Sequence, residues 1–301
     1  TITFWYGIGT VEQWNAFAAK TGTTVEGFGG NYRLTADIDF AGVDFMPAAG
    51  TPSETPNGTA GFSGTFDGCG YSMSNILLAS HNSAVFINLN GTGVIQNLVI
   101  NGIQANGSGC AGLVIHNYGT VKDNLVINFY DISSWGAALV SNNTSFGTVS
   151  GCIADKVTFD NPTSNNFSLV KANIGKIENC LTVESNAAND VGAGKPDGTK
   201  TNVITIESFT DDGGDSVFAY ADGNYTYTQG ESLTVTFSDA LWTLDEETKH
   251  LVLKKSDESF ATSTVAGDFS SLVAWAIGNK VWGYSGEQTH GGVITQNVCY
   301  D

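Results

Sequence analysis

Four short segments between residues 91 and 183 can be superposed on one another, and this repeat restricts the fold more than any other feature of the chain. The segments read GTGVIQNLVI, GTVKDNLVI, GTVSGCIAD and GKIENCLTV. Aligned at intervals of 27, 28 and 28 residues, one apolar column contains Val94, Val121, Val149 and Ile177. The next apolar column contains Leu98, Leu125, Ile153 and Leu181. Apolar columns that stay in phase over four copies predict a solenoid of stacked units.

Polar residues and cysteines form further columns of the same repeat. The third column reads Asn97, Asn124, Cys152 and Cys180, and an earlier segment, FSGTFDGCGYSMSNILL, adds Asn75. The fourth reads Asn90, Asn117 and Asn173, with the pair Asn142 and Asn143 in the intervening copy. Strands this short are unstable alone, but coils stacked about 4.8 Å apart pair their backbones and let equivalent amides bond in ladders. The sequence therefore predicts an all-β chain wound into a parallel β-helix, with corners of positive φ at Gly119, Gly147 and Gly175.

Residues 10–20, TVEQWNAFAAK, have the one convincing helical pattern in the chain. Thr10 and Gln13 match a capping box, and one face of the expected helix carries Val11, Trp14, Phe17 and Ala18. An open end of a β-helix is a bare sheet edge, so we expect this helix to cover it. The segment YRLTADIDF then predicts one strand whose buried face carries Leu34, Ala36, Ile38 and Phe40.

The order of these motifs resembles a known family. The segments VEQWNAFAAK, YRLTADIDFAG, FSGTFDGCGYSMSNILL and GTVKDNLVI, over roughly residues 10–185, are similar to GLUG-type repeat proteins of bacterial and archaeal cell surfaces. The resemblance implies a right-handed β-helix, a cell-surface setting, and a role in adhesion or surface architecture, with no catalytic residues. The later coils depart from the family because AGLVIHN and GAALVSN replace its glycine-rich GLFG element.

The C-terminal third differs from the repeat in composition and pattern. Residues 185–202 contain few large apolar side chains and predict a linker or long loop, and about seven short strands follow, as is typical of a β-sandwich. We therefore expect a terminal strand over 1–9, a capped β-helix over 10–200 and a β-rich, sandwich-like domain over 201–301. Because LWTLDEETKHLVLKK resembles the closing segment of many GLUG-type proteins, the alternative is a β-helix that extends to about residue 255.

The chain is strongly acidic, with a formal net charge of −18. Such a surface repels phosphate backbones and anionic lipids, which argues against nucleic-acid and membrane-surface partners, and no apolar stretch is long enough to predict a membrane-spanning helix. Divalent cations are the favoured ions. Within DDGGDS, weak candidate ligands for Ca²⁺ are Asp211, Asp212 and Asp215, although a solvated acidic turn is the commoner explanation. We expect no other cofactor.

Parallel β-helices also include glycan-cleaving enzymes, so catalysis has to be weighed. Elimination on uronates uses a strong base beside a cation, and Arg33 is the single arginine of the chain. Hydrolysis uses paired carboxylates, but no acidic pair recurs in register among Asp123, Asp131, Asp155, Asp160, Glu178 and Glu184. The four histidines His81, His116, His250 and His290 are scattered. We expect a protein that is not an enzyme.

Both ends of the chain contain strand-like segments, TITFWYG and GGVITQNVCYD. The first projects large side chains to one side at Ile2, Phe4 and Tyr6. Such a strand can complete the sheet of a neighbouring subunit and so link copies into a filament, or it can pair within its own chain. The absence of an initial methionine is consistent with a removed signal peptide or a trimmed chain, which favours an extracellular location.

Cysteines and sequons leave alternatives open. Cys152 and Cys180 share one column, where either a disulfide or a reduced buried pair fits, and Cys299 is left over for a bond between subunits. Candidate glycan acceptors are Asn57, Asn106, Asn142, Asn143, Asn166 and Asn224, whereas Asn90 falls in an expected inner column.

These features favour an extracellular structural protein that assembles with copies of itself into a surface filament, sheath or adhesin. The alternative is a carbohydrate-binding module that stacks glycans on exposed aromatic residues, with candidates Trp135, Trp242, Trp275 and Trp282. A glycan-cleaving enzyme is the third and least favoured reading.

Overall fold

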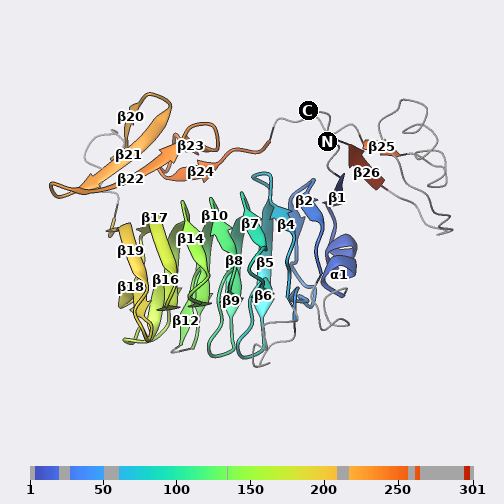
Figure 1. The fold of residues 1–301 in the computed structure, drawn as a ribbon, viewed down its shortest axis with the longest axis horizontal. Coiled ribbons are helices and arrows are strands. Elements are labelled where there is room, and N and C mark those ends of the chain that lie inside the picture. The colour runs from blue at the N-terminus through green and yellow to red at the C-terminus, as the bar shows by residue number, and fades with distance from the viewer. Residues whose placement is uncertain are drawn as a thin grey trace.

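The computed structural model describes residues 4–19, 28–50, 61–133, 135–208 and 217–256, and the backbone of 262–264 and 295–298. Short parallel strands wind into a β-helix of about six turns. Figure 1 shows its coils side by side, from α1 (Val11–Ala19) at one end to β18 and β19 at the other. Nearly all regular structure in these residues is strand, which confirms the all-β, helix-capped fold expected from the repeat.

Two faces of the β-helix belong to one 15-stranded sheet. The first face follows the order β1 (Phe4–Ile8), β2 (Asn31–Leu34), β4 (Thr65–Asp67), β7 (Val94–Gln96), β10 (Thr120–Lys122), β14 (Thr148–Ser150) and β17 (Lys176–Val183). The second face follows β3 (Ile38–Asp39), β5 (Ser72–Leu78), β8 (Val99–Ala105), β11 (Leu125–Asp131) and β15 (Ile153–Phe159). Strand β17 is long enough to join both faces, and β19 (Thr199–Ile206) pairs with it in parallel.

A second sheet forms the third face. Its strands are β6 (Phe86–Leu89), β9 (Val114–Asn117), β12 (Gly136–Ala137), β13 (Val140–Asn143), β16 (Asn166–Asn173) and β18 (Asn189–Ala193). Strand β18 lies within the segment 185–202 that was expected to be a linker, and β19 begins in that segment. The β-helix therefore continues to Ile206. Small and polar residues can form strands there because the backbone of the preceding coil supplies the hydrogen-bond partners.

Helix α1 covers the end of the β-helix that β1 and β2 form (Figure 1). Thr10 caps it as expected, because the Gln13 amide donates to Thr10 Oγ1. Gln13 Oε1 accepts from the Gly9 amide at 2.7 Å, one residue before the N-cap amide that a capping box uses. Trp14 and Phe17 are buried, and the Trp14 ring contacts the rings of Phe17, Phe40, Phe45, Phe66 and Phe86. The expected cap is confirmed, and it closes this end with an aromatic core.

The segment YRLTADIDF is not one strand, as its alternation predicted. It divides into β2 on the first face and β3 on the second, with a corner at residues 35–37 between them. Leu34, Ile38 and Phe40 are buried on both sides of that corner, while Ala36 is half-buried within it. Alternate residues remain buried on both sides of the corner because both strands face the same interior.

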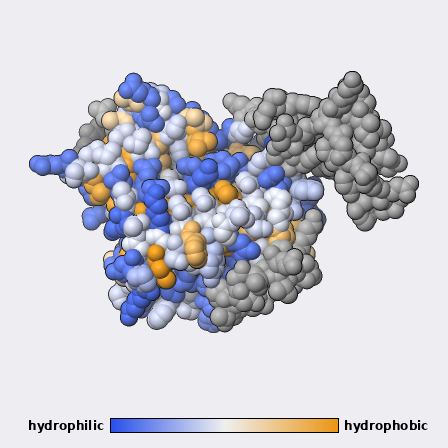
Figure 2. Space-filling view, viewed as in Figure 1, coloured by the Kyte–Doolittle hydropathy of each residue, from blue (hydrophilic) through white to orange (hydrophobic). Residues whose placement is uncertain are grey.

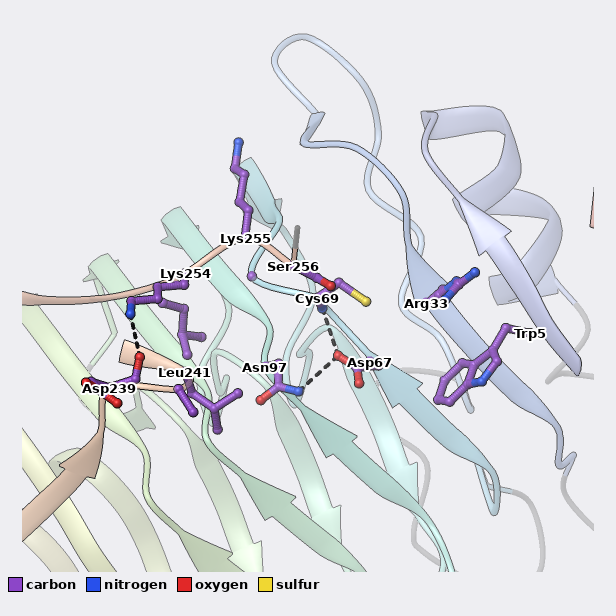
Figure 3. A pocket seen from close by; sticks show the side chains of 13 residues that line it. Trp5, Arg33, Asp67, Cys69, Asn97, Asp239, Leu241, Lys254, Lys255 and Ser256 are labelled. Carbon is purple, nitrogen blue, oxygen red and sulfur yellow. Dashed lines mark hydrogen bonds between the residues drawn. The ribbon is translucent and has the colours of Figure 1, made fainter. Parts of the chain in front are cut away.

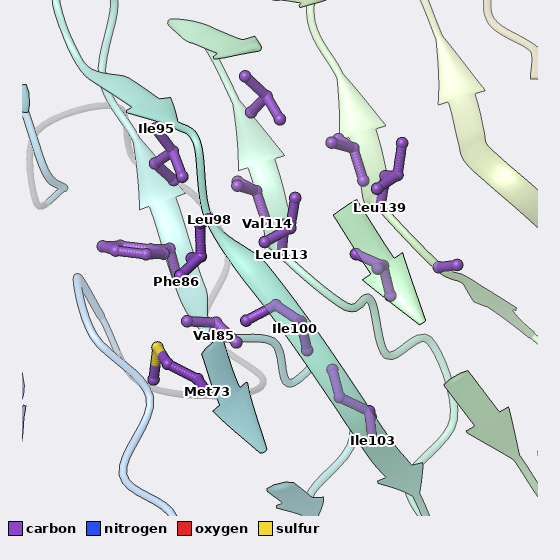
Figure 4. Close-up of a cluster of buried hydrophobic side chains, with 14 of the residues drawn as sticks. Met73, Val85, Phe86, Ile95, Leu98, Ile100, Ile103, Leu113, Val114 and Leu139 are labelled. Carbon is purple, nitrogen blue, oxygen red and sulfur yellow. The ribbon is translucent and has the colours of Figure 1, made fainter. Parts of the chain in front are cut away.

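Figure 4 shows the apolar interior, which contains Phe86, Leu98 and Ile100 from one coil and Leu113 and Leu139 from the next two coils. These side chains belong to one continuous buried cluster that extends from the aromatic cap to Val203. A buried side chain of this size contributes about 1.5–3 kcal/mol by leaving water. The stacked coils therefore share a single core along the axis.

The predicted register is wrong by one residue at its first step. Val121 pairs with Ile95, and Thr120 pairs with Val94, so the first interval is 26 residues and not 27. Gly93, and not Gly91, is consequently the equivalent of Gly119. Ile95 is fully buried, whereas Val94 is half-buried. The register is fixed by which of the two side chains enters the core, and that side chain is Ile95.

This shift changes the composition of the predicted columns. Leu125, Ile153 and Leu181 do lie in one file, but Val99 takes the place predicted for Leu98. This file faces outward and is buried under the C-terminal sheets. Leu98 lies instead in the inward file that continues through Asn124, Cys152 and Cys180, as the pairings of the adjacent residues require.

Asn97 and Asn75 belong to neither of those files. Both have a left-handed backbone, with φ of 52° and 57°, and each begins a column of corners. The Asn97 column continues through Asp123, Gly151, Asn179 and Asn202, and the Asn75 column continues through Gly102, Asn128, Lys156 and Glu184. Asn, Asp and Gly tolerate this conformation best, which explains the asparagine columns read from the sequence.

The predicted corners at Gly119, Gly147 and Gly175 do not have positive φ. They are needed for space: a Cβ at Gly119 would lie 2.3 Å from the Gly93 oxygen, and one at Gly175 would lie 2.2 Å from the Gly147 oxygen. Backbone of successive coils therefore passes too closely at this column for a side chain.

The predicted amide ladder is present, with one member changed. Asn117 Nδ2 donates to Asn143 Oδ1 at 2.8 Å, and Asn143 Nδ2 donates to Asn173 Oδ1 at 2.7 Å. Leu89, and not Asn90, pairs with Asn117, so Asn90 lies outside the ladder. Buried amides that satisfy one another along the axis avoid the cost of unpaired polar groups.

The C-terminal part packs on the β-helix. Its elements are the three-stranded sheet β20 (Ala219–Ala221), β21 (Asn224–Gln229) and β22 (Leu233–Ser238), and the hairpin β23 (Trp242–Leu244) and β24 (Leu251–Leu253). Val235, Phe237 and Trp242 pack against the outward file of Leu125, Ile153 and Leu181. In residues 217–256 the apolar face of these sheets is covered by the β-helix itself. Most of 257–301 lies outside the described residues, so the sandwich-like domain expected over 201–301 stays a prediction.

Candidate functional site

A cleft of about 600 Å³ lies between the first coils and the C-terminal segment that passes over them (Figure 3). Strands β1, β2 and β4 supply Trp5, Arg33 and Asp67, and residues 239–241 and 253–256 form the opposite wall. The remaining lining residues are Cys69, Gly70 and Asn97. The C-terminal segment is fixed there by backbone bonds, including the Ser256 amide to the Cys69 oxygen at 2.9 Å.

The cleft combines an aromatic ring with polar and charged groups. The guanidinium of Arg33 lies 6.0 Å from the centroid of the Trp5 ring, within the range of a cation–π contact. Asp67 is fixed by three donors, namely Gln96 Nε2, Asn97 Nδ2 and the Cys69 amide. An aromatic surface beside fixed amide, carboxylate and guanidinium groups can bind a polar molecule with a flat apolar face, such as a sugar.

A second group of chemically active side chains lies where the C-terminal hairpin meets the β-helix. Asp155 comes from β15, Glu184 follows β17, and His250 precedes β24. His250 Nδ1 is 2.6 Å from Asp155 Oδ2, and His250 Nε2 is 3.7 Å from Glu184 Oε1. One ligand atom from each residue lies within 4.8 Å of the other two, so the three side chains could hold a metal ion.

Burial limits what this cluster can do. The side chains of His250 and Asp155 are 8% and 6% exposed, whereas that of Glu184 is 33% exposed. A general base must reach the proton that it removes from a substrate, and His250 is buried against Asp155 of the β-helix. The arrangement therefore suits the joining of two structural elements better than catalysis.

A third titratable group is enclosed in the β-helix itself. Asp131 is fully buried, and its Oδ2 has no hydrogen-bond partner, while Oδ1 accepts from the Ser133 amide at 2.6 Å. Desolvation raises the pKa of Asp131 to about 6. Burial, and to a smaller extent the charge of Asp131, raises the pKa of the Cys110 thiol to about 11, so this thiol stays protonated at neutral pH.

The proposed exchange strand pairs on both sides within one chain. Strand β1 is parallel to β2 and antiparallel to β26 (Thr295–Val298), which in turn pairs with β25 (Thr262–Thr264). Tyr6 is 49% exposed and stacks on Tyr32 with ring centroids 5.1 Å apart. Ile2 lies outside the described residues, and of Phe4 the backbone alone is described. Exchange between copies stays a prediction.

The remaining predicted residues fall into different environments. Asp211, Asp212 and Asp215 lie outside the described residues, as do Asn57, Cys299, Trp275 and Trp282. Cys152 and Cys180 are free and buried, which decides for the reduced pair. Trp242 is buried and cannot stack on a glycan, whereas Trp135 is 48% exposed with Lys171 Nζ over its ring.

The asparagines predicted as glycan acceptors also differ in how exposed they are. Asn143 belongs to the buried ladder and Asn166 is fully buried, so neither can accept a glycan in this fold. Asn142 and Asn224 are half-buried, and Asn106 is exposed and is the accessible candidate among these.

Sequence reasoning missed the cluster of Asp155, Glu184 and His250. The repeat contained part of the signal, because Asp155 pairs with Val183 in the next coil and therefore lies beside Glu184. Nothing in the repeat indicated His250, which comes from outside it and 95 residues after Asp155. The cleft was missed for the same reason, since its second wall is formed by residues beyond the β-helix.

No family model matches the chain, and no curated protein matches it. A solved structure with a similar fold is that of a protein described as a "putative immunoglobulin A1 protease" from Bacteroides ovatus. The two chains share 15% sequence identity with a TM-score of 0.51, over 84% of this chain and 93% of the other. At this identity the likeness establishes the fold and carries no activity to this chain. Among the described residues there is also no helix of the length and hydrophobicity that a membrane span requires.

Proposed function

We propose that this protein is a non-enzymatic extracellular structural protein, whose copies join into a cell-surface filament, sheath or adhesin through β-strand contacts. The observation that carries the proposal is the antiparallel pairing of β26 with β1 at the edge of the large sheet. Strand β26, with β25 beyond it, there extends the sheet past the first strand of the chain.

The same backbone contacts can form between two copies. Phe4, Trp5 and Tyr6 lie opposite Val298, Asn297 and Gln296, and this register depends on backbone groups that every copy presents. Each copy would then donate one strand and accept one strand, which is a head-to-tail contact that extends into a filament when it does not close into a ring. The stacked coils with their amide ladder supply the stiff body that such a filament needs.

Paired cysteines distinguish pairing within a chain from pairing between chains. Tyr6 and Gln296 lie directly opposite, at a Cα separation of about 4.5–5.5 Å that a disulfide can span. We expect a Tyr6→Cys, Gln296→Cys, Cys299→Ser variant to give a ladder of covalent oligomers on a non-reducing gel after mild oxidation. Oxidised product that migrates wholly as an intrachain-linked monomer would reject exchange.

A proline variant tests the same contact without new chemistry. Asn297 pairs with Trp5 on one side and Thr262 on the other, so Asn297→Pro removes an amide that the sheet uses. We expect filaments seen by negative-stain microscopy to be lost while the melting of the β-helix is unchanged, and Asn297→Thr to assemble normally. Wild-type protein that remains monomeric at every concentration would also count against the proposal.

The cleft supports a second candidate, a carbohydrate-binding role, because Trp5 and Arg33 lie together at its edge. Arg33, Lys254 and Lys255 all line the cleft and give it local positive charge, so a glycan bearing carboxylates is the best match for it. We expect oligogalacturonate to bind in calorimetry and Trp5→Ala to weaken binding at least tenfold, with Trp135→Ala as the matched control. Equal affinity of both variants would remove the cleft from consideration.

A further inference from the structure

We propose that Asp155, Glu184 and His250 bind one divalent transition-metal ion of the zinc type, and that this ion fastens the C-terminal hairpin to the β-helix. This inference is independent of the proposed filament role, since it concerns contacts within one chain.

The donor set favours zinc over calcium. Zn²⁺ accepts imidazole nitrogen and carboxylate oxygen at about 2.0–2.2 Å, whereas Ca²⁺ takes six to eight oxygen ligands. One ligand atom from each side chain already lies within 4.8 Å of the other two. Ligand atoms around a tetrahedral zinc ion are about 3.4 Å apart, so movements of roughly an ångström would bring the three side chains into place, and a water molecule would take the fourth position.

Charge and burial supply a second argument. The Oδ1 atom of Asp155 is buried and has no hydrogen-bond partner, although Oδ2 of the same carboxylate contacts His250. A buried carboxylate oxygen without a partner is costly unless a cation or a donor satisfies it. Two carboxylates also face one imidazole, which carries at most a single positive charge. A divalent cation would balance both carboxylates and satisfy the orphan oxygen.

The location gives the ion a structural task. Asp155 and Glu184 belong to neighbouring coils, while His250 belongs to the hairpin of β23 and β24. Glu184 is partly exposed, so an ion can enter from solvent and then be covered by His250. Metal bound across these three elements would link parts of the chain that are otherwise held by apolar packing and hydrogen bonds.

The test is zinc binding by the full chain after treatment with a chelator, measured by calorimetry and by metal analysis of the dialysed protein. We expect one Zn²⁺ per wild-type chain, and a dissociation constant at least tenfold higher for Glu184→Gln and His250→Gln. Glu178→Gln is the matched control, because Glu178 lies on β17 and pairs with Lys176 away from the cluster. Circular dichroism verifies that each variant is folded.

A second readout separates a structural clasp from incidental binding. We expect Zn²⁺ to slow hydrogen exchange of the β24 amides at residues 251–253 by at least tenfold in the wild type and to have no effect in Glu184→Gln. Because Glu184 is partly exposed, this variant tests the site even if His250→Gln disturbs the hairpin. Absence of zinc binding by the wild type, unchanged affinity in both variants, or selective binding of Ca²⁺ there would overturn the proposal.

Discussion

The two ends of the β-helix are closed by opposite kinds of chemistry. At the α1 end, the Trp14 and Phe17 rings pack into a cluster with aromatic rings of the first coils. At the β18 and β19 end, Asp190 accepts hydrogen bonds from Ser168 and Thr205, and the Ser168 hydroxyl also contacts Thr182. One end is thus stabilised by apolar area and the other by a hydrogen-bond network.

The difference teaches how each end meets its surroundings. The aromatic end is covered by a helix, so large apolar side chains are removed from water there. Among the described residues, β18 pairs with β16 and β19 pairs with β17, and each lies at an edge of its sheet. Polar side chains suit such an edge because they make unwanted pairing unfavourable. Figure 2 shows that hydrophobic residues are scattered over the visible described surface and form no broad patch.

The largest expected effect comes from the aromatic end. Trp14→Ala removes a fully buried ring and its Nε1 hydrogen bond to the Met46 oxygen, which should lower the free energy of unfolding by about 3–5 kcal/mol. Denaturant unfolding measures the change. Trp135→Ala, at a half-exposed site, should cost less than about 1 kcal/mol. Similar losses for the two variants would mean that the cap does not stabilise the coils.

The middle of the interior gives the next largest effect. Asn143→Ala leaves the Oδ1 atom of Asn173 without its ladder donor and removes the acceptor of Asn117, at a cost of about 2–4 kcal/mol. The neighbouring Asn142→Ala loses one contact to the His116 ring and should cost about 1 kcal/mol or less. Thermal melts of both variants decide whether the ladder stabilises the fold or merely fills space.

The buried carboxylate of Asp131 predicts a pH dependence. Its pKa is raised to about 6 in the folded chain, from 3.8, so the native state holds the proton more tightly than the unfolded chain. The stability that this proton contributes is complete below about pH 4 and is lost as the pH rises through 6. Asp131→Asn should therefore stabilise the protein by about 1–3 kcal/mol at pH 7 and have little effect at pH 4. An equal effect at both pH values would show that desolvation is not the cause.

The smallest effect is expected at the polar end. Asp190→Asn keeps one oxygen acceptor and replaces a charge-assisted bond by a neutral one, which should cost about 1 kcal/mol. Asp190→Leu should cost more, because the hydroxyls of Ser168 and Thr205 would both lose their acceptor. Urea unfolding compares the two variants, and a leucine variant that is as stable as the wild type would remove the distinction between the two ends.

Much of the fold was predictable because it repeats. The apolar columns, the helix cap and the amide ladder each follow from side chains that recur at coil spacing, and Asn117, Asn143 and Asn173 confirm the ladder. The register failed at Ile95 because GTGVIQ offers two glycines to align with Gly119, and only burial distinguishes them. The column of Leu125, Ile153 and Leu181 faces outward, which its spacing did not reveal because an apolar column has the same period on either face of a sheet.

The candidate sites were less predictable because their parts do not share the repeat. His250 approaches Asp155 from a hairpin far along the chain, and the second wall of the cleft comes from residues beyond the β-helix. The sequence by itself determined the coil, its cap and its polar ladder, since those depend on local periodicity and on equal spacing of like residues. Only the tertiary structure decided where the C-terminal sheets lie, because docking depends on which apolar face of the finished β-helix is left to be covered.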